Sequence, residues 1–550
     1  MSNHKNFIEQ IIEEDLNNGF KRKELCFRFP PEPNGYLHIG HVKAITLNFE
    51  LGKKYNAPVN LRFDDTNPVK ENSHFVEEIK NNIKWLGYEW SKICYASDYF
   101  EKLYEWAHYL ILNDKAYVDS QTSEQIAIQK GTPTNPGTNS PYRNRPKEES
   151  ARIFTEMREG KHKEGAHVLR AKIKMDSQNM LMRDPVMYRI LFKDHHRTGS
   201  KWCIYPMYDW AHGESDYIEK ISHSLCTLEF KPHRDLYEWF LHQLPKENKI
   251  LPKQREFARL NMSYTIMSKR KLSYLIEKKI VSSWDDPRMP TISGMIKRGY
   301  PPNALINFVK KAGIAKRENI IDVSLMEFYV REELNKTCAR VMVVTDEIKL
   351  VIINYPEDKH EILEATNNPE DESQGKRKMI FSKYLYIERE DFRETANRKF
   401  FRLTIGNEVR LKNAYIIKAE NCIKNEKGEV IEVHCTYDPK SKSGSNSEES
   451  QRKVKGTIHW VDINSSIDVY INEYERLFYK EKPDENDDLI KGVNTNSKKL
   501  IVGKSEHFVS SLQIGQKVQF QRKGYYIVDS NEGGVISFNK TVSLRDGWRK

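Results

Sequence analysis

Two histidines three residues apart, His38 and His41, stand where an apolar segment gives way to a helical pattern. The apolar residues 24–29 are followed by three prolines within 30–33, and the helical pattern begins near His38. A helix N-terminus offers free N–H groups and partial positive charge, which suit a polyphosphate, and Gly40 leaves room for one. The pattern predicts a strand, a stiff turn and a phosphate-binding helix start. An ordinary turn with two surface histidines is the alternative.

Two aspartates, Asp64 and Asp65, end a second predicted strand that begins at Pro58. Strand, helix and strand is the nucleotide-binding half of a doubly wound sheet, in which ligands lie outside the carboxyl ends of the strands. We therefore expect Asp64 beside His38 and His41. Substrate binding on one hand, and helix capping or ion pairing on the other, are both open for the aspartates.

Three further segments carry polar groups that could do chemistry. The strand WCIYPMYDW, expected to return to the sheet, places Tyr208 at its carboxyl end. His195 and His196 could suggest a metal, but neighbouring side chains of extended backbone point to opposite sides, which favours a loop or RNA-facing role. The segment 265–272, TIMSKRKL, predicts a mobile basic loop that reaches phosphates; a solvated basic face is the alternative.

The whole chain indicates a large, basic, intracellular protein. Its 550 residues predict three to five domains, and its net charge of +11 fits either a polyanion-binding surface or a protein that is simply basic. The seven cysteines form no metal-ligand spacing and are expected to be reduced thiols. The N-terminus is acidic and amphipathic, unlike a signal peptide, and no apolar run approaches the roughly 20 residues that span a bilayer. The expected location is cytoplasmic.

Beyond about residue 336, short runs of β-branched and aromatic residues replace the helical patterns. Such runs at close spacing predict antiparallel β-barrels, and SKSGSNSEES at 441–450 predicts a surface loop in one of them. Basic and aromatic residues alternate along the runs, as suits a reader of single-stranded RNA. The polar-out, apolar-in alternation of any barrel is the competing explanation.

Two of these segments, residues 31–41 and 266–270, resemble known signatures. PEPNGYLHIGH is similar to the HIGH signature of class I aminoacyl-tRNA synthetases, and IMSKR is similar to their KMSKS signature. Ile266 stands where the second signature often has Lys and Arg270 where it has Ser, while Met267, Ser268 and Lys269 are intact. Longer strings extend the resemblance over nearly the whole chain to the glutamyl/glutaminyl subfamily, and most closely to its glutamine-specific members: RFDDTNP, KWCIYPMYD, HSLCTLEF, WDDPRMPTISG, RLKNAYIIKAE, KGTIHWV and TVSLRDGW.

The resemblance implies an α/β protein with a Rossmann doubly wound catalytic core, an inserted acceptor-stem-binding domain, a helical subdomain and two C-terminal antiparallel β-barrels that read the anticodon. The expected domains are the first half of the Rossmann core (1–100), the inserted domain (101–200), the second half of the core (201–262), the KMSKS-type loop with the helical subdomain (263–335), the first part of the proximal barrel (336–384), the distal barrel (385–482) and the second part of the proximal barrel (483–550).

The implied activity is ATP-dependent attachment of L-glutamine to tRNA(Gln) through an adenylate, with Mg²⁺ accompanying ATP, no structural metal and no membrane, in a monomer. His38, His41 and Lys269 are the expected catalytic groups. The residues expected around ATP are Glu32, Pro33, Asn34, His38, Ile39, Gly40, His41, Val42, Lys43, Ala44, Thr227, Arg259, Leu260, Met267, Ser268 and Lys269. A non-catalytic tRNA-binding relative would be expected to have lost one of the catalytic three, and none is lost.

For the amino acid, the resemblance implies that Asp64 binds the α-ammonium and Tyr208 the side-chain amide. Cys226 occupies a position where glutamate-specific relatives commonly have arginine, and without that cation a substrate carboxylate would be desolvated unpaired. Glutamine is therefore favoured, and a glutamate-using enzyme of the same subfamily, with or without discrimination between the two, is the alternative. The positions matched to tRNA contacts are Lys316, Arg317, Arg340, Arg402, Arg410, Gln519 and Arg522.

Overall fold

The computed structural model describes residues 5–485 and 488–545, and the chain forms two compact units. Unit 1 comprises Met1–Asn261 with Val309–Ile321, and unit 2 comprises Met262–Phe308 with Asp322–Lys550. The longer helices of the first unit are α1 (Phe7–Asn17), α2 (Ile39–Tyr55), α3 (Ser73–Trp85), α4 (Phe100–Leu112), α6 (Lys147–Arg158), α7 (Tyr208–Ile218) and α8 (Arg234–Gln243). The first unit also contains the short helix α5 (Ser123–Gln129).

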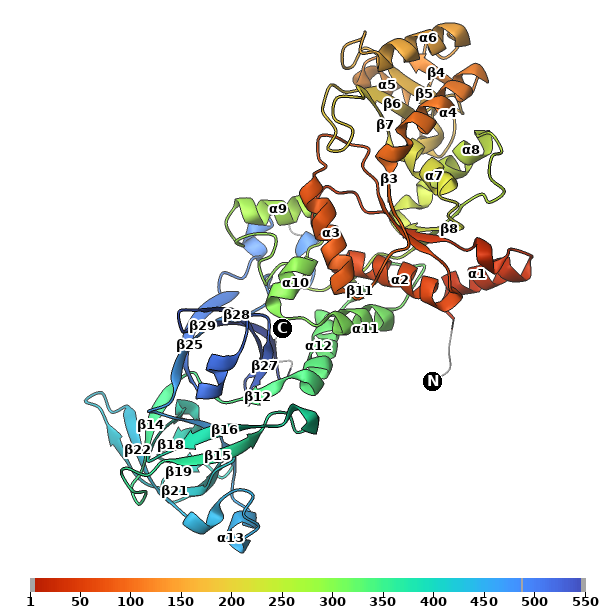
Figure 1. Cartoon of the computed structure of the whole chain (residues 1–550). Helices are drawn as coiled ribbons and strands as arrows, with labels where there is room; N and C mark the ends of the chain where they lie inside the picture. Colours follow the sequence, from red (N-terminus) through yellow and green to blue (C-terminus); the bar gives the residue numbers. More distant parts are fainter. Residues whose placement is uncertain (1–4, 486–487, 546–550) are drawn as a thin grey trace. The chain divides into compact units, whose positions relative to one another are not determined.

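A parallel sheet organises the first unit (Figure 1). Strand β2 (Val59–Phe63) lies between β1 (Phe27–Phe29) and β3 (Ile93–Tyr95), and both pairings are parallel. The parallel pair β8 (His223–Thr227) and β9 (Lys253–Phe257) adjoins β1, because the main-chain N–H of Ser222 donates to the oxygen of Cys26 at 3.0 Å. Helix α2 packs against β1, β2 and β8. The doubly wound core predicted from the sequence is confirmed.

The antiparallel sheet of the inserted segment has the order β4–β5–β6–β7. Its strands are β4 (Ala116–Asp119), β5 (Val168–Ala171), β6 (Val186–Ile190) and β7 (Ile204–Pro206). The strand around residue 205 was expected to return to the parallel sheet, but β7 pairs antiparallel with β6, with Tyr188 opposite Pro206. It ends at Pro206, and Tyr208 begins α7 instead of extending the strand. Trp202, Ile204 and Tyr205 are buried in the apolar cluster that includes the inserted sheet, which explains the difference.

The second unit begins with helices and continues into two barrels. Its helices include α9 (Lys269–Glu277), α10 (Ile292–Arg298) and α12 (Val323–Thr337), while α11 (Pro302–Ala312) runs from the second unit into the first. The basic loop predicted at 265–272 is wrong in part, because α9 starts at Lys269. Buried Ile266 and Leu272 anchor the two sides of this segment in an apolar cluster with Leu477 and Phe478.

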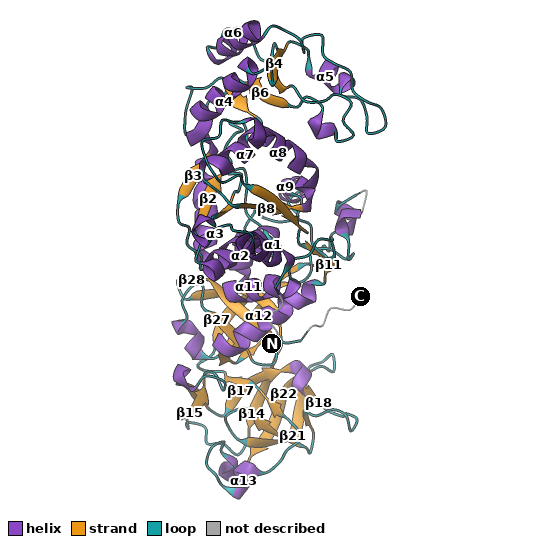
Figure 2. Ribbon diagram, turned by 90° about the vertical axis from the view of Figure 1, so that its right-hand side faces the viewer, coloured by secondary structure: helices purple, strands orange, loops and turns teal. Residues whose placement is uncertain are grey.

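Each barrel is a seven-stranded sheet whose two edge strands follow one another in the chain. The proximal sheet has the order β12–β27–β28–β29–β25–β26–β13, and β12 is separated from β13 only by Met342. The distal sheet has the order β23–β20–β21–β22–β14–β17–β24, and β23 is separated from β24 only by His459. A single residue therefore joins the two edges of each sheet. Strands β17, β14 and β22, which are neighbours in the distal sheet, lie side by side in Figure 2.

The strands of the proximal barrel are β12 (Ala339–Val341), β13 (Val343–Val344), β25 (Ile467–Tyr474), β26 (Lys498–Ser505), β27 (Lys517–Phe520), β28 (Gly524–Glu532) and β29 (Val535–Ser543). Those of the distal barrel are β14 (Glu347–Ile352), β17 (Tyr384–Glu388), β20 (Glu408–Leu411), β21 (Ile416–Lys424), β22 (Val430–Tyr437), β23 (Thr457–Ile458) and β24 (Trp460–Asp462). The two barrels predicted from the sequence are confirmed, but they are mixed: β12 with β27, β14 with β22, β20 with β23 and β25 with β29 are parallel. The bounds expected for them are wrong. Strand β14, expected in the proximal barrel, pairs with β17 and β22 of the distal one, and β25, expected in the distal barrel, pairs with β26 and β29 of the proximal one.

Two smaller expectations concern the loops and thiols. The Ser-rich segment 441–450 carries the short helix α13 (Glu448–Gln451) at its end, capped by the Ser447 side chain. Each of the seven cysteines is a free thiol. Within residues 5–485 and 488–545, no helix is both long enough and apolar enough to cross a bilayer.

Candidate active site

The turn of residues 30–38, which is expected to bind the nucleotide and is called the nucleotide turn below, is held by a hydrogen-bonded cap made of the two histidines. His38 is the N-cap of α2, and its Nδ1 accepts the main-chain N–H of Gly40 at 3.1 Å. His41 Nδ1 accepts the main-chain N–H of His38 at 3.0 Å, so each ring satisfies one of the donors that a helix start leaves open. The ring centroids lie 4.0 Å apart. The helix start expected near His38 is confirmed.

This cap determines where the imidazole protons lie. Because both Nδ1 atoms accept N–H bonds, a neutral ring carries its proton on Nε2, the atom available to a ligand. Burial and the neighbouring His41 lower the pKa of His38, and burial lowers the pKa of His41 to about 4. Both rings are therefore neutral near pH 7, and each offers one Nε2–H donor. Such a pair can hydrogen-bond phosphate oxygens without adding a positive charge.

The remainder of the segment 38–44 divides between two faces of α2. Ile39 and Val42 are fully buried in the core, so their side chains contribute to packing. The buried Lys43 ammonium donates to the main-chain oxygen of Ala258 at 2.7 Å, and burial lowers its pKa to about 8. Its head group ties α2 to the end of β9 and is occupied there. Gly40, His41 and Ala44 are partly exposed. In the preceding turn Glu32 is exposed, Asn34 is partly exposed and Pro33 is buried.

The other residues expected around ATP lie in both units. Thr227 ends β8, Arg259 is exposed and forms an ion pair with Glu229, and Leu260 is buried. Met267, Ser268 and Lys269 belong to the second unit, where Ser268 is the N-cap residue of α9 and Lys269 its first residue.

A buried network of charges surrounds Asp64. Arg62 donates from Nε to Asp64 Oδ1 at 2.7 Å and from NH1 to Asp216 Oδ1 at 2.7 Å. Arg28 donates to the same Asp216 oxygen at 2.9 Å, and the two arginine side chains are completely buried. Burial opposes ionisation of Asp64, but the Arg62 guanidinium holds its pKa below the usual value. The site thus keeps an ionised carboxylate in a place from which water is excluded.

His212 connects this network to Tyr208. Its Nδ1 lies 3.1 Å from Asp64 Oδ2, and its Nε2 lies 3.0 Å from Arg28 NH2. The same Nδ1 also lies 3.1 Å from Arg62 NH2, so the ring contacts both arginines as well as Asp64. Tyr208 stacks on this ring with centroids 4.9 Å apart. Burial, followed by the charges of Asp64 and Cys226, raises the pKa of Tyr208 far above its usual value, so its hydroxyl keeps its proton.

Cys226, the third residue expected at the amino acid, is also electrically neutral. Burial raises the pKa of its thiol to about 12. Its neighbour across the ladder is Glu256, whose carboxylate is already paired with Arg234 and accepts from Gln254 at 2.9 Å. Neutral Cys226 and the neutral hydroxyl of Tyr208 match an uncharged amide better than a carboxylate.

Arg28, His212 and Asp216 were not identified from the sequence, although they hold Asp64 in place. A signal existed for the arginines: Arg28 and Arg62 stand in the middle of the short strands FRF and VNLRF, where every residue is buried. A cation at such a position needs a buried acid as a partner. The partner lies on α7, about 150 residues away along the chain, so local patterns could not identify it.

Four of the seven residues matched to tRNA contacts form two pairs in the second unit. Arg340 and Gln519 are opposite one another in the ladder of β12 and β27, and Arg340 NH1 donates to Asn368 Oδ1 at 2.6 Å. Arg402 and Arg522 share one buried acid, Asp391, at 3.2 Å and 2.6 Å. Arg522 has a φ of 68° in the turn between β27 and β28, a conformation that is rare for a residue with a side chain.

The other matched positions lie apart from these pairs. Arg410 holds the Ser-rich segment through main-chain oxygens of Ser441 and Ser450, at 3.0 and 2.7 Å. Lys316 and Arg317 are exposed in the first unit, and the Lys316 ammonium lies 4.9 Å from the centre of the Phe7 ring.

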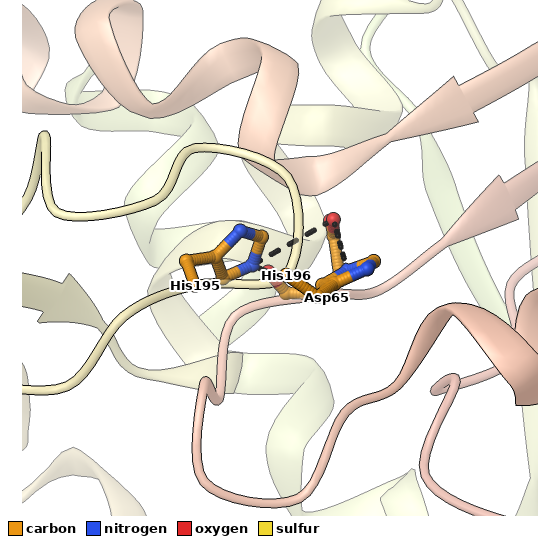
Figure 3. A group of neighbouring side chains, drawn as sticks. All are labelled: Asp65, His195 and His196. Carbon is orange, nitrogen blue, oxygen red and sulfur yellow. Dashed lines mark hydrogen bonds and ion pairs between the residues drawn. The ribbon is translucent and has the colours of Figure 1, made fainter.

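A second group of polar side chains gathers at Asp65, the residue that follows Asp64 (Figure 3). His195 and His196 were expected to point to opposite sides, which is wrong, since both rings face Asp65. The tight turn that pairs His195 with Gly199 allows this convergence. The buried Glu71 lies beside them, with Oε2 3.7 Å from His195 Nε2. Burial raises the pKa of Glu71 to about 7.

This raised pKa predicts how stability changes with pH. Above pH 4.5 the unfolded chain loses the Glu71 proton before the folded protein does, so stability falls as pH rises toward 7 and then levels off, by at most about 3 kcal/mol. Glu71→Gln removes this loss. We expect the difference in melting temperature, Glu71→Gln minus wild type, to be several degrees larger at pH 8 than at pH 5. Glu364→Gln, an exposed control, should give equal differences at both values; equal differences for Glu71→Gln would contradict the prediction.

The fold and the site are those of a known class of enzyme. A family model described as tRNA synthetases class I (E and Q), catalytic domain, matches residues 24–336. Two models of the anti-codon binding domain of the same class match residues 338–438 and 457–529. The chain therefore belongs to the class I tRNA synthetases of the E and Q family.

Curated relatives match over nearly their full length. A protein from Clostridium perfringens named glutamine–tRNA ligase is 50% identical over 547 residues, covering 99% of this chain and 98% of that protein. Proteins of the same name from Rhodopirellula baltica and Cronobacter sakazakii are 50% and 48% identical. They cover 99% of this chain, and 90% and 98% of those proteins.

Proposed function

We propose that this enzyme attaches L-glutamine to tRNA(Gln) with ATP, supplied as its Mg²⁺ complex, and releases AMP and pyrophosphate. The observation that carries the choice of glutamine is that Cys226 and Tyr208, the two groups expected at the substrate side chain, are themselves uncharged. The pKa of Cys226 is raised to about 12 and that of Tyr208 is raised too, so both groups keep their protons. The full-length relatives named glutamine–tRNA ligase support the same choice.

In the first step, the glutamine carboxylate attacks the α-phosphorus of ATP, the bond to the bridging oxygen breaks, and pyrophosphate leaves with its electron pair. The protein contributes by positioning the reactants and stabilising the growing charge. We assign the Nε2–H groups of His38 and His41 as donors to the phosphate oxygens and Lys269 as the cation for the departing pyrophosphate. We assign ionised Asp64 as the partner of the α-ammonium and the Tyr208 hydroxyl as a partner of the amide.

In the second step, a ribose hydroxyl of the tRNA 3′ end attacks the adenylate carbonyl, its proton is lost, and AMP leaves. The carboxylates of Asp64 and Asp216 are weak bases, because the charges of the neighbouring arginines lower their pKa values. We propose that the phosphate oxygen of the adenylate accepts the proton.

The specificity for glutamine is tested by charging purified tRNA(Gln) with labelled glutamine or glutamate. The expected result is charging with glutamine at least 100-fold more efficient in kcat/KM. Equal use of glutamate would replace the proposal with a non-discriminating enzyme, and no charging in the presence of ATP would indicate a tRNA-binding protein without this activity.

We also propose that the inserted antiparallel sheet binds the acceptor stem and that the two barrels read the anticodon, with Arg402 among the reading residues. Asp391 holds Arg402 and Arg522 together, so their guanidinium groups are oriented before tRNA binds. Arg402→Ala should therefore raise the KM for tRNA at least 10-fold and change the KM for ATP less than 2-fold. Arg393→Ala, which removes a nearby arginine stacked on Phe400, is the matched control. Equal rises in both constants would refute anticodon reading by Arg402.

A further inference from the structure

The loop of residues 194–200 lies between β6 and β7 of the inserted sheet. Three consecutive side chains of this loop, His195, His196 and Arg197, contact the parallel sheet and the residues that follow its strands. Arg197 NH1 donates to Ser97 Oγ at 2.8 Å and to Asp98 Oδ1 at 2.7 Å. Its guanidinium also lies 3.7 Å from the centre of the Tyr95 ring. These contacts attach the loop at the end of β3, the neighbour of β2.

The two histidines of the same loop attach it to the end of β2 (Figure 3). His195 Nε2 lies 2.9 Å from the main-chain oxygen of Asp65, and His196 Nε2 lies 3.1 Å from its Oδ2. Asp65 also accepts the N–H of Ser97 at 2.9 Å and its hydroxyl at 2.7 Å. Four hydrogen bonds thus fix one fully buried residue, two of them from the inserted segment.

The protons of this cluster favour a hydrogen-bonded structure over a metal site. His195 Nδ1 accepts the main-chain N–H groups of Arg197 and Thr198 at 3.2 and 3.3 Å, so the ring proton lies on Nε2 and is donated to Asp65. A metal on Nε2 would require the proton to move to Nδ1, where it would face these two donors. The cluster of Asp65, His195 and His196 has the residue types of a metal site but not its arrangement of protons.

We propose that this loop is a clasp that positions Asp64 for the amino acid, with His196 as a positioning residue. The inference rests on the proposed role of Asp64 in binding the α-ammonium. Asp64 and Asp65 are consecutive, and the main-chain N–H of Asp64 donates to Pro31 in the nucleotide turn at 3.1 Å. The contacts of Asp65 and of Pro31 therefore hold the main chain of Asp64 from both sides, while Arg62 holds its carboxylate. The inserted segment thereby contributes to the amino acid site without contacting the amino acid.

The test compares the full-length wild type with His196→Ala, His196→Gln and Arg197→Ala, using aminoacylation of tRNA(Gln) with either glutamine or ATP varied. His196→Ala should raise the KM for glutamine about 10-fold and change the KM for ATP less than 2-fold. His196→Gln, whose amide N–H can replace the donor to Asp65, should recover most of the loss. Arg197→Ala should act in the same direction with a smaller effect. His162→Ala, a partly exposed histidine of the inserted segment paired with Glu156, should match the wild type.

The melting temperature is measured for every variant to separate positioning from unfolding. Equal rises in both KM values, or an unchanged KM for glutamine in folded His196→Ala and Arg197→Ala, would overturn the clasp. Stoichiometric zinc in the purified wild type, lost in His196→Ala, would also overturn it in favour of a metal site. If the wild type uses glutamate instead of glutamine, the proposed function fails, and the same KM comparison with glutamate then tests the clasp separately.

Discussion

Replacing Asp64 with asparagine is expected to raise the KM for glutamine about 100-fold, with a much smaller change in the KM for ATP. The carboxylate is buried and kept ionised by Arg62, so an ammonium group bound to it forms a desolvated ion pair. Removing one member of such a pair costs about 3 kcal/mol, which corresponds to about two powers of ten in affinity. Steady-state charging of tRNA(Gln) at varied glutamine and varied ATP measures both constants.

The matched control is Asp119→Asn, which removes the carboxylate from another fully buried pair, with Arg170 NH1 at 2.7 Å. This pair lies in the inserted sheet, so its loss should lower the melting temperature and leave the KM for glutamine unchanged. In the Asp64 variant, Arg62 keeps Asp216 as a partner at 2.7 Å, which should allow folding. Similar glutamine constants for the two variants would show that the loss at Asp64 is structural only.

The second large effect is expected from Cys226→Arg, which should lower the preference for glutamine over glutamate about 100-fold in kcat/KM. A guanidinium at this position can pair with a substrate carboxylate, whose unpaired burial costs several kcal/mol, and it leaves an amide facing an unmatched charge. The adjacent Glu256 is already paired with Arg234, so it competes weakly for the new cation. ATP–pyrophosphate exchange in the presence of tRNA, with each amino acid, measures the preference.

Cys226→Ala is the control for this substitution because it removes the thiol without adding a charge. It should keep the preference for glutamine within a few-fold of the wild type. An unchanged preference in Cys226→Arg, with the protein folded, would show that position 226 does not select the substrate.

The parts predicted correctly from the sequence are those encoded by neighbouring residues. The start of α2 was predictable because prolines suppress helix up to the turn, and His38 and His41 cap the helix from within it. The C-terminal barrels were predictable because alternating strands repeat at short intervals. The strand pairings within them were not predictable, because strands far apart in the chain, such as β14 and β22, are direct partners.

Two predictions were wrong for one physical reason, which is that contacts between residues distant in sequence decided the local structure. Tyr208 was placed on a strand because residues 202–206 are apolar, yet these residues pack in the inserted sheet and a helix begins at Tyr208. The segment after Ser268 was predicted as a loop because it is basic, while its helix is fixed by Leu272 against residues near 477. In both cases the deciding contact is distant in sequence and lies outside any local pattern.

The closure of the proximal barrel at Met342 has a consequence for the order of events during synthesis. Strands β12 and β13 emerge before the whole distal barrel, but their partners β26 and β27 lie beyond residue 497. The distal barrel can close as soon as β24 has been made, whereas β12 and β13 must wait unpaired until the last part of the chain appears. A released chain that ends near residue 480 should therefore hold a protease-resistant distal barrel and a proximal region that is still open to cleavage.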